Sequence, residues 1–189
     1  NNINRDHSSK DIIEKYKLIE KYNFNSINMD LIIGLPNQKF EIFKNTLKSI
    51  VDLSPDNITI HSLALKRGSK LYNNDYEFEN TNVIRKSMDY AKSFLNQNYH
   101  PYYMYRQKNI AGNLENIGFC KKNKESLYNI KIMEEKHSIL AFGAGAVSKI
   151  SYYSTDRFDR VANSKGLEDY MKRVDEMANK KIKKINSIL

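Results

Sequence analysis

The segment NSINMDLIIGLPNQ, residues Asn25–Gln38, decides the fold that we expect for this chain. Apolar and polar residues alternate over Ile27–Ile33, which is the period of a β-strand, and Gly34 and Pro36 then end the strand. The apolar set can pack against covering helices, so Asp30 is expected to point the opposite way, near the C-terminal end of the strand. That end carries the functional groups of parallel α/β barrels. A buried strand with one hydrogen-bonded aspartate is the alternative.

Further elements extend this pattern along the chain. Apolar stripes at helical spacing predict helices over 8–22, 39–53 and 81–98, and β-rich segments predict strands over 26–33, 57–65 and 101–106. This order predicts three parallel strands with crossover helices on one side. We expect a loop over 109–124, a helix over 132–140 and a closing basic helix over 166–189. We expect the chain to divide into two regions. Residues 1–107 contain the β/α units, and residues 108–189 pack on them.

Composition limits the class of protein. The 189 residues are 40% hydrophobic and 28% charged, which is typical of a folded domain or a piece of a larger one. No apolar run is long enough to span a bilayer, so we expect no membrane association. The chain begins with Asn1 and has no signal-peptide pattern, which favours an excised piece. Cys120 is the only cysteine; this excludes an internal disulfide and fits a reducing cytoplasm.

Charge and local motifs leave several binding functions open. The net charge of +9 suits nucleic acid, anionic lipid or an acidic small molecule, although a solvated basic face is the default and no nucleic-acid motif is present. The GAGAVS segment at Gly143–Ser148 lacks the third glycine of a dinucleotide loop. His61 is interpreted as a hydrogen-bonded residue of a strand. The tyrosines of 102–105 and Arg106 suit a flat acidic ligand, or else form a half-buried strand.

Longer motifs resemble one enzyme family. The chain is similar over nearly its whole length to the oxygen-independent coproporphyrinogen III oxidases, also called coproporphyrinogen dehydrogenases, which are radical S-adenosylmethionine (SAM) enzymes. The bacterial version with a YRQKN…GNLEN block is the closest in pattern. The matching blocks are INRDH at Ile3–His7, NMDLIIGLP at Asn28–Pro36, NITIHSLALKRGSKL at Asn57–Leu71, YYMYRQKNIAGNLENIGF at Tyr102–Phe119 and LAFGAGAVSK at Leu140–Lys149.

The resemblance implies a fold of which this chain is a part. Such enzymes have a parallel (β/α)6 partial TIM barrel, in which a CxxxCxxC motif after the first strand holds a [4Fe-4S] cluster. This chain lacks that motif, and Cys120 does not supply it. Because thiolates are needed to hold such a cluster, the chain is expected to be the C-terminal part of the α/β barrel, with a mostly helical extension. Alone, it is expected to bind no cluster and to be inactive.

The resemblance also implies four cofactor-binding positions. Arg5 and Asp30 match residues that contact SAM, and Ala64 and Val147 match positions that lie against it. Ser62 departs from the family pattern, because better-studied members carry a different polar residue there. We therefore expect Asp30 to face the barrel mouth together with the other three, while no catalytic residue and no metal ligand are assigned in this chain.

The implied activity is the oxidative decarboxylation of coproporphyrinogen III to protoporphyrinogen IX in heme biosynthesis. Its partners would be a porphyrinogen with four carboxylates, for which Arg106, Lys66 and Arg67 are candidate contacts by charge, and an electron donor protein. A heme-binding or heme-delivery relative without this activity is the first alternative, another radical enzyme is the second, and a nucleic-acid-binding domain is the third. We further expect an open sheet edge, through which the chain can self-associate.

Overall fold

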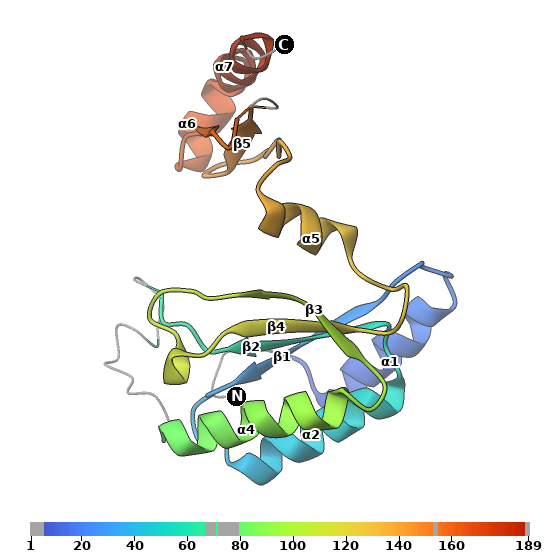
Figure 1. Ribbon diagram of the computed structural model, residues 1–189. Helices are drawn as coiled ribbons and strands as arrows, with labels where there is room; N and C mark the ends of the chain where they lie inside the picture. The colour runs from blue at the N-terminus through green and yellow to red at the C-terminus, as the bar shows by residue number, and fades with distance from the viewer. Residues whose placement is uncertain (1–5, 67–70, 72–79, 153–154, 188–189) are drawn as a thin grey trace. The chain divides into compact units, whose positions relative to one another are not determined.

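The computed structural model describes residues 6–66, 71, 80–152 and 155–187. The chain divides into two compact units, Asn1–Ser126 and Leu127–Leu189. Figure 1 labels their helices and strands. The predicted border between residues 107 and 108 falls inside the first unit.

Three helices of the first unit follow the predicted pattern closely. Helix α1 spans Ser9–Glu20, α2 spans Phe40–Leu53 and α4 spans Thr81–Leu95. The start of α1 is fixed by a capping box, in which the Ser8 side chain accepts from the Asp11 amide and the Asp11 carboxylate accepts from the Ser8 amide. Each helix ends within three residues of its predicted end, because the apolar stripe of each sequence stops there.

Four strands form the sheet of the first unit, in the order β1-β2-β4-β3. Strands β1 (Asn28–Ile33) and β2 (Asn57–Ser62) are parallel, as predicted. Strand β4 (Asn116–Cys120) lies antiparallel between β2 and β3 (His100–Tyr105).

The prediction of a loop over 109–124 was therefore wrong. Strand β3 runs in the same direction as β1 and β2, but it pairs with β4 and not with a parallel neighbour. The sequence NIGFC is short, begins with Asn, contains a glycine and is bordered by Glu115 and Lys121, so its strand pattern is weak.

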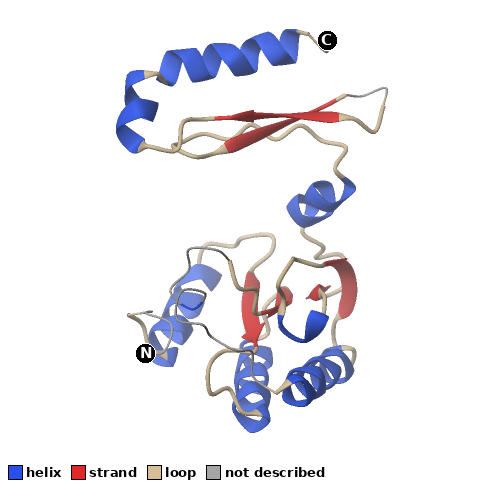
Figure 2. Ribbon diagram, turned by 90° about the vertical axis from the view of Figure 1, so that its left-hand side faces the viewer, coloured by secondary structure: helices blue, strands red, loops and turns tan. Residues whose placement is uncertain are grey.

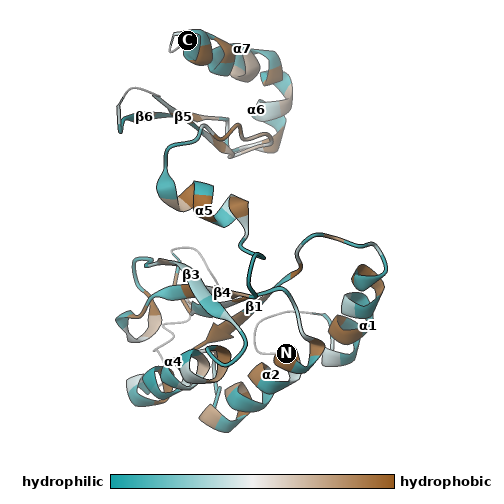
Figure 3. Ribbon diagram, turned by 45° about the vertical axis from the view of Figure 1, so that its right-hand side comes forward, coloured by the Kyte–Doolittle hydropathy of each residue, from teal (hydrophilic) through white to brown (hydrophobic). Residues whose placement is uncertain are grey.

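Helices α2 and α4 cover one face of this sheet (Figure 1). Apolar residues of β1 and α2 supply part of the buried layer between them, as the brown segments of Figure 3 show. This packing confirms the predicted orientation of β1, because Leu31 and Ile33 are buried against the helices while Asp30 is exposed. The buried cluster consists of Leu31, Ile33, Phe43, Leu47, Ile58, Ile60, Ile84, Met88, Ala91, Leu95, Tyr99, Ala111, Ile117 and Phe119.

Strand β1 is the edge of the sheet in the described part of the chain, and β2 is its one neighbour there. The expected open edge is therefore present among these residues. The side chain of Gln38 folds back onto the end of β1, where its amide accepts from the Gly34 N–H at 2.8 Å and donates to the Ile32 carbonyl at 2.9 Å. Self-association through this edge stays a prediction.

The second unit combines a β-hairpin with helices. Its elements are α5 (Leu127–Glu134), β5 (Val147–Ser151), β6 (Phe158–Ala162), α6 (Leu167–Lys172) and α7 (Val174–Asn186). Figure 2 shows the antiparallel hairpin beside α7. The helix expected over 132–140 ends at Glu134. The single closing helix is divided at Arg173, whose φ of −122° interrupts the helical backbone.

Candidate functional site

A row of side chains crosses the sheet on the face opposite α2 and α4. Asp30 of β1 is paired in register with Thr59 of β2, Thr59 with Gly118 of β4, and Gly118 with Tyr103 of β3. Residues that are directly paired across strands lie on the same face of the sheet. The four strands therefore bring a carboxylate, a hydroxyl and a phenol to one line, with a glycine between them.

Gly118 allows the phenol to reach the inner strand. A Cβ atom at this position would lie 1.8 Å from Cε1 of Tyr103, which no real side chain tolerates. Because Gly118 has no side chain, the ring of Tyr103 passes over β4, and its hydroxyl lies 3.3 Å from Oγ1 of Thr59. This glycine therefore has a steric role, since its neighbour occupies the space of a side chain.

Asp30 is held in place by two neighbours. Its Oδ1 accepts from Nδ2 of Asn28 at 2.6 Å, and its Oδ2 lies 3.5 Å from Nε2 of His61. The hydrogen bond to His61 lowers the pKa of the Asp30 carboxyl from its usual value, against the opposing effect of burial. The side chain remains 56% exposed, so an anionic carboxylate is presented to a ligand from this face.

The next positions of the same strands add an imidazole and a second phenol. The Tyr105 hydroxyl lies 3.3 Å from Nδ1 of His61, so His61 contacts both Asp30 and Tyr105. The rings of Tyr103 and Tyr105 stack with an interplanar angle of 8° and a centroid distance of 6.2 Å. Burial raises the pKa of both phenols, which keeps them neutral hydrogen-bonding groups.

Two hollows border Asp30 along the free edge of β1. One has a volume of about 620 Å³ and is lined by α1, β1 and α2. The other has a volume of about 790 Å³ and extends toward Pro36 and Gln38. His7, in the INRDH block, lines both of them together with Asp30. The edge of β1 therefore offers concave, largely apolar space directly beside the carboxylate.

The structure describes three of the four expected cofactor positions. Asp30 is the third of six residues of β1, so it lies at mid-strand and not at the C-terminal end. Ala64 follows β2 and forms an antiparallel bridge with Ile110. Arg5 lies outside the described residues, and Val147 begins β5 in the second unit. The convergence of all four stays a prediction.

The charged residues that the sequence suggested for an acidic ligand differ in their surroundings. The Arg106 guanidinium donates to the carboxylate of Glu115, and this bond lowers the pKa of that carboxyl. The Arg106 side chain is 50% exposed, so a substrate carboxylate would share the guanidinium with Glu115. Lys66 is exposed, and Arg67 lies outside the described residues.

Two features of this face were not predicted from sequence. The passage of Tyr103 over Gly118 depends on β4, which the sequence pattern did not indicate. The same strand brings Cys120 beside His100, with Glu125 close to both. Cys120 is buried, and burial raises the pKa of its thiol to about 11. The residue types alone could not reveal this cluster, because its members are dispersed over 26 positions of the chain.

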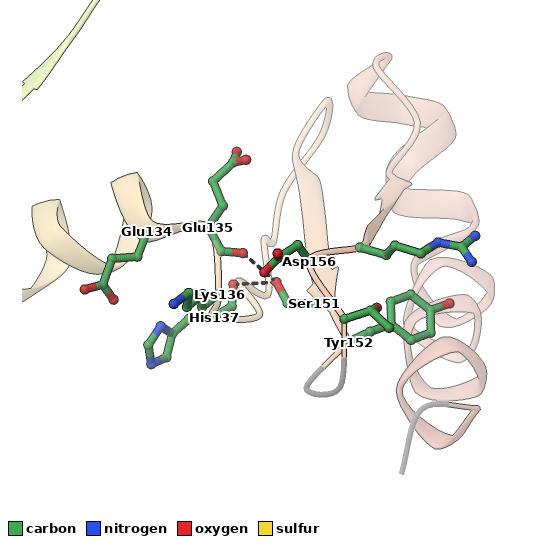
Figure 4. A pocket seen from close by; sticks show the side chains of 9 residues that line it. Glu134, Glu135, Lys136, His137, Ser151, Tyr152 and Asp156 are labelled. Atoms are coloured by element: carbon green, nitrogen blue, oxygen red, sulfur yellow. Dashed lines mark hydrogen bonds between the residues drawn. The ribbon is translucent and has the colours of Figure 1, made fainter.

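A separate pocket of about 590 Å³ lies in the second unit. Figure 4 shows the side chains that line it; Ser151 donates from Oγ toward the carbonyls of Glu135 and His137, both at 3.1 Å. Its rim carries both signs of charge, including Glu134, Lys136 and Asp156. These hydrogen bonds connect the end of α5 with β5 and give the pocket a structural role.

Comparison with known proteins places these features in context. No family model matches the chain. The chain is 39% identical over 189 residues to the oxygen-independent coproporphyrinogen-III oxidase-like protein HemZ of Bacillus subtilis, covering 98% of this chain and 38% of that protein. It is 26% identical over 171 residues to a putative heme chaperone HemW-like protein of Buchnera aphidicola, covering 90% of this chain and 42% of that protein.

A solved structure shows the fold. The coproporphyrinogen III oxidase HemN of Escherichia coli, described as a radical SAM enzyme, superimposes with a TM-score of 0.63 and 21% identity. The match covers 92% of this chain and 39% of that chain, so the chain has the fold of part of that enzyme. In the described residues, no helix combines the length and the apolar character needed to cross a membrane.

Proposed function

Because the chain belongs to the family of oxygen-independent coproporphyrinogen III oxidase-like proteins, we propose that it is the cofactor-orienting part of a radical SAM enzyme of heme biosynthesis. The proposed reaction of the parent protein is the oxidative decarboxylation of two propionate side chains of coproporphyrinogen III to vinyl groups, which gives protoporphyrinogen IX. The chain spans about two fifths of the curated relatives described above. The proposal therefore assigns activity to the longer protein and none to this part alone.

The position of Asp30 is the observation that carries this proposal. Its carboxylate lies on the face away from the helices, is held by Asn28 and His61, and borders open space. An anionic carboxylate in such a place accepts hydrogen bonds from ribose hydroxyls and favours a cationic sulfonium ligand. In the proposed site, Arg5, Ala64 and Val147 complete the contacts with SAM.

The donor atoms of this chain fit SAM but not the iron–sulfur cluster. A [4Fe-4S] cluster needs several thiolates, and the sequence contains Cys120 alone. The proposed cluster ligands therefore belong to the remainder of the longer protein. When bound, SAM and the cluster supply the radical that removes a hydrogen atom from the substrate. This chain's residues bind and orient SAM, and the apolar walls of the hollows exclude water.

Charge supports the proposed substrate class. A net charge of +9 attracts a porphyrinogen that carries four carboxylates. The exposed Lys66 is one cation available to it, and the half-exposed Arg106, which also binds Glu115, is another. An electron donor protein and a cytoplasmic location belong to the same proposal.

A heme-binding or heme-delivery function is the second candidate. It is favoured by the similarity to the HemW-like protein, which extends over 90% of this chain. Two measurements on the longer protein separate the candidates: anaerobic consumption of coproporphyrinogen III with SAM, and the Soret absorbance on titration with heme. Turnover of the porphyrinogen favours the oxidase. Stoichiometric heme binding without turnover favours the second function.

The substitution Asp30→Asn in the longer protein tests the cofactor site. Loss of a charge-assisted hydrogen bond costs on the order of 1.5–3 kcal/mol, so the dissociation constant of SAM should rise about 10- to 150-fold. Calorimetric titration measures this change, while the absorbance of the cluster should be retained. The matched control is Asp89→Asn on the exposed side of α4. Equal SAM affinity in the wild type and the Asp30 variant would refute the assignment.

A further inference from the structure

Three side chains with different metal-binding atoms meet at one end of the sheet. His100 begins β3, Cys120 ends β4, and the two residues are directly paired in the antiparallel register. Glu125 follows five residues after Cys120. The imidazole, the thiol and the carboxylate each offer one ligand atom, and all of these atoms lie within 4.8 Å of one another. The strand pairing fixes two members of this cluster, which is independent of the SAM site proposed around Asp30.

The distances in the cluster are close to those of a metal centre. Nε2 of His100 lies 2.9 Å from Oε1 of Glu125 and 3.3 Å from Sγ of Cys120. Around a tetrahedral zinc ion, with bonds of 2.0–2.3 Å, ligand atoms are separated by about 3.4–3.7 Å. Small shifts of the exposed side chains of His100 and Glu125 would bring all three separations, which lie within 4.8 Å, to these values.

The carboxylate of Glu125 is already oriented toward the imidazole of His100. Backbone N–H groups of Glu125 and Asn123, together with His100, hydrogen-bond to the carboxylate. Asn123 has a left-handed φ of 63°, which turns the chain after β4 toward His100. Such outer contacts are what orient the ligands in metal sites.

Neighbouring lysines do not occupy this place. The ammonium group of Lys121 donates to Ser54, at 2.6 Å to its carbonyl and 2.8 Å to its hydroxyl. Lys124 donates to the Asn25 carbonyl at 2.6 Å and lies 3.4 Å from Asp56. Both cations are directed to other partners, so the negative charge of Glu125 stays available to a cation held between the three ligands.

An unsatisfied acceptor lies in the same row of the sheet. Asn57 is paired across the strands with Cys120 and is fully buried. Its Nδ2 donates to Ser26 and Lys124, but its Oδ1 has no hydrogen-bond partner in the described residues. A buried acceptor without a partner calls for a bound water or ion nearby.

We propose that His100, Cys120 and Glu125 bind one divalent transition-metal ion of the zinc type. Nitrogen, sulfur and oxygen ligands of this kind are typical of zinc, and three protein ligands leave a fourth position for water. On binding, the Sγ–H bond of Cys120 breaks, the proton passes to solvent and the sulfur electron pair forms the bond to the metal. The ion connects β3, β4 and the following turn.

Cobalt(II) titration of the 189-residue chain tests this site. Cobalt replaces zinc in such sites, and a thiolate ligand gives it a charge-transfer band in the near ultraviolet. Because Cys120 is the only cysteine, this band reports on one sulfur atom without ambiguity. The expected result is a band that saturates at one cobalt per chain and is removed by zinc. Absence of the band at stoichiometric cobalt would overturn the proposal.

Single substitutions test each of the three ligands. His100→Gln, Glu125→Gln and Cys120→Ala should each weaken cobalt binding at least tenfold, because loss of even an outer-shell partner typically costs 10- to 100-fold. The controls are His137→Gln and Glu134→Gln, exposed residues of the same types in the second unit. Equal affinity in the controls and the His100 and Glu125 variants would refute the ligand set.

Folding does not obscure this outcome. His100 and Glu125 are partly exposed, with side chains that are 46% and 35% accessible, so their substitutions should leave the circular dichroism spectrum unchanged. If the cluster is only a hydrogen-bonded group, in which the thiol contacts the imidazole, wild type and controls will show no sulfur-to-cobalt band. That result counts against the proposal.

Discussion

The two units of this chain are stabilised in different ways. In the first unit, a continuous layer of buried aliphatic and aromatic side chains lies between the sheet and α2 and α4. In the second unit, Ile150 and Met177 are the buried hydrophobic residues of the described part, beside buried Ser148, Ser151, Asn163 and Lys181. The second unit also exposes large apolar side chains, among them Phe142, Leu167 and Met171.

This difference indicates that the first unit can fold on its own and that the second unit cannot. Buried apolar area is the main favourable term in folding, and the first unit has most of it. The second unit relies on a hairpin and on hydrogen bonds such as those of Ser151. A unit of this size rarely supplies enough hydrophobic core for stability on its own.

Separating the chain between Ser126 and Leu127 should have the largest effect. The segment 1–126 is expected to unfold cooperatively on heating, because its core is complete within that segment. The segment 127–189 alone is expected to show no cooperative transition by circular dichroism or calorimetry. A sharp melting transition of the isolated second segment would contradict the contrast between the units.

Two phenylalanine truncations should sharpen the comparison. Phe119 is 1% exposed in the core of the first unit, and Phe142 is 77% exposed in the second. Phe119→Ala should reduce the free energy of unfolding by about 3–5 kcal/mol, whereas Phe142→Ala should change it by less than about 0.5 kcal/mol. Urea unfolding measures both. Similar losses in the two variants would mean that both units depend equally on apolar burial.

Alkaline pH should affect the first unit through Tyr99. Its hydroxyl donates to the Pro55 carbonyl at 2.9 Å, and burial raises its pKa to about 12. The folded state favours the neutral phenol, so this contribution is present below pH 10 and is lost as the pH rises from 10 to 12. The loss amounts to about 2–3 kcal/mol.

The measurement compares urea unfolding at pH 9 and pH 11.5. In the variant Tyr99→Phe, the fall in stability between these values should be smaller than in the wild type. Tyr128→Phe is the control, because Tyr128 is 68% exposed on α5 and should leave the pH dependence unchanged. An identical fall in all three proteins would show that Tyr99 does not couple folding to pH.

Sequence pattern predicted the fold where local signals are strong. Helices α1, α2 and α4 and strands β1 and β2 carry clear periodicity, and the parallel pairing of β1 with β2 follows from the helix between them. Strand β4 was missed because its pairing with β2 and β3 is a tertiary effect. The hairpin of β5 and β6 was missed because glycine and alanine precede it, and such residues indicate turns.

The candidate site was predicted in part for the same reason. The alternation around Asp30 indicates its face, but the strand order that brings Tyr103 to Thr59 cannot be read from local spacing. The contact of Asp30 with His61 requires the register of β1 with β2. Individual residues were therefore identifiable, while their partners depended on long-range pairing.

The strand order β1-β2-β4-β3 has a consequence for synthesis on the ribosome. The Ser62 amide at the end of β2 donates at 2.8 Å to Oδ1 of Asn116, which is added 54 residues later. Because synthesis adds about 5–20 residues per second, one edge of β2 remains unpaired for about 3–11 s. A ribosome that stalls between these two residues would hold a nascent chain whose central strand has a free edge and is open to pairing with its neighbours on a polysome.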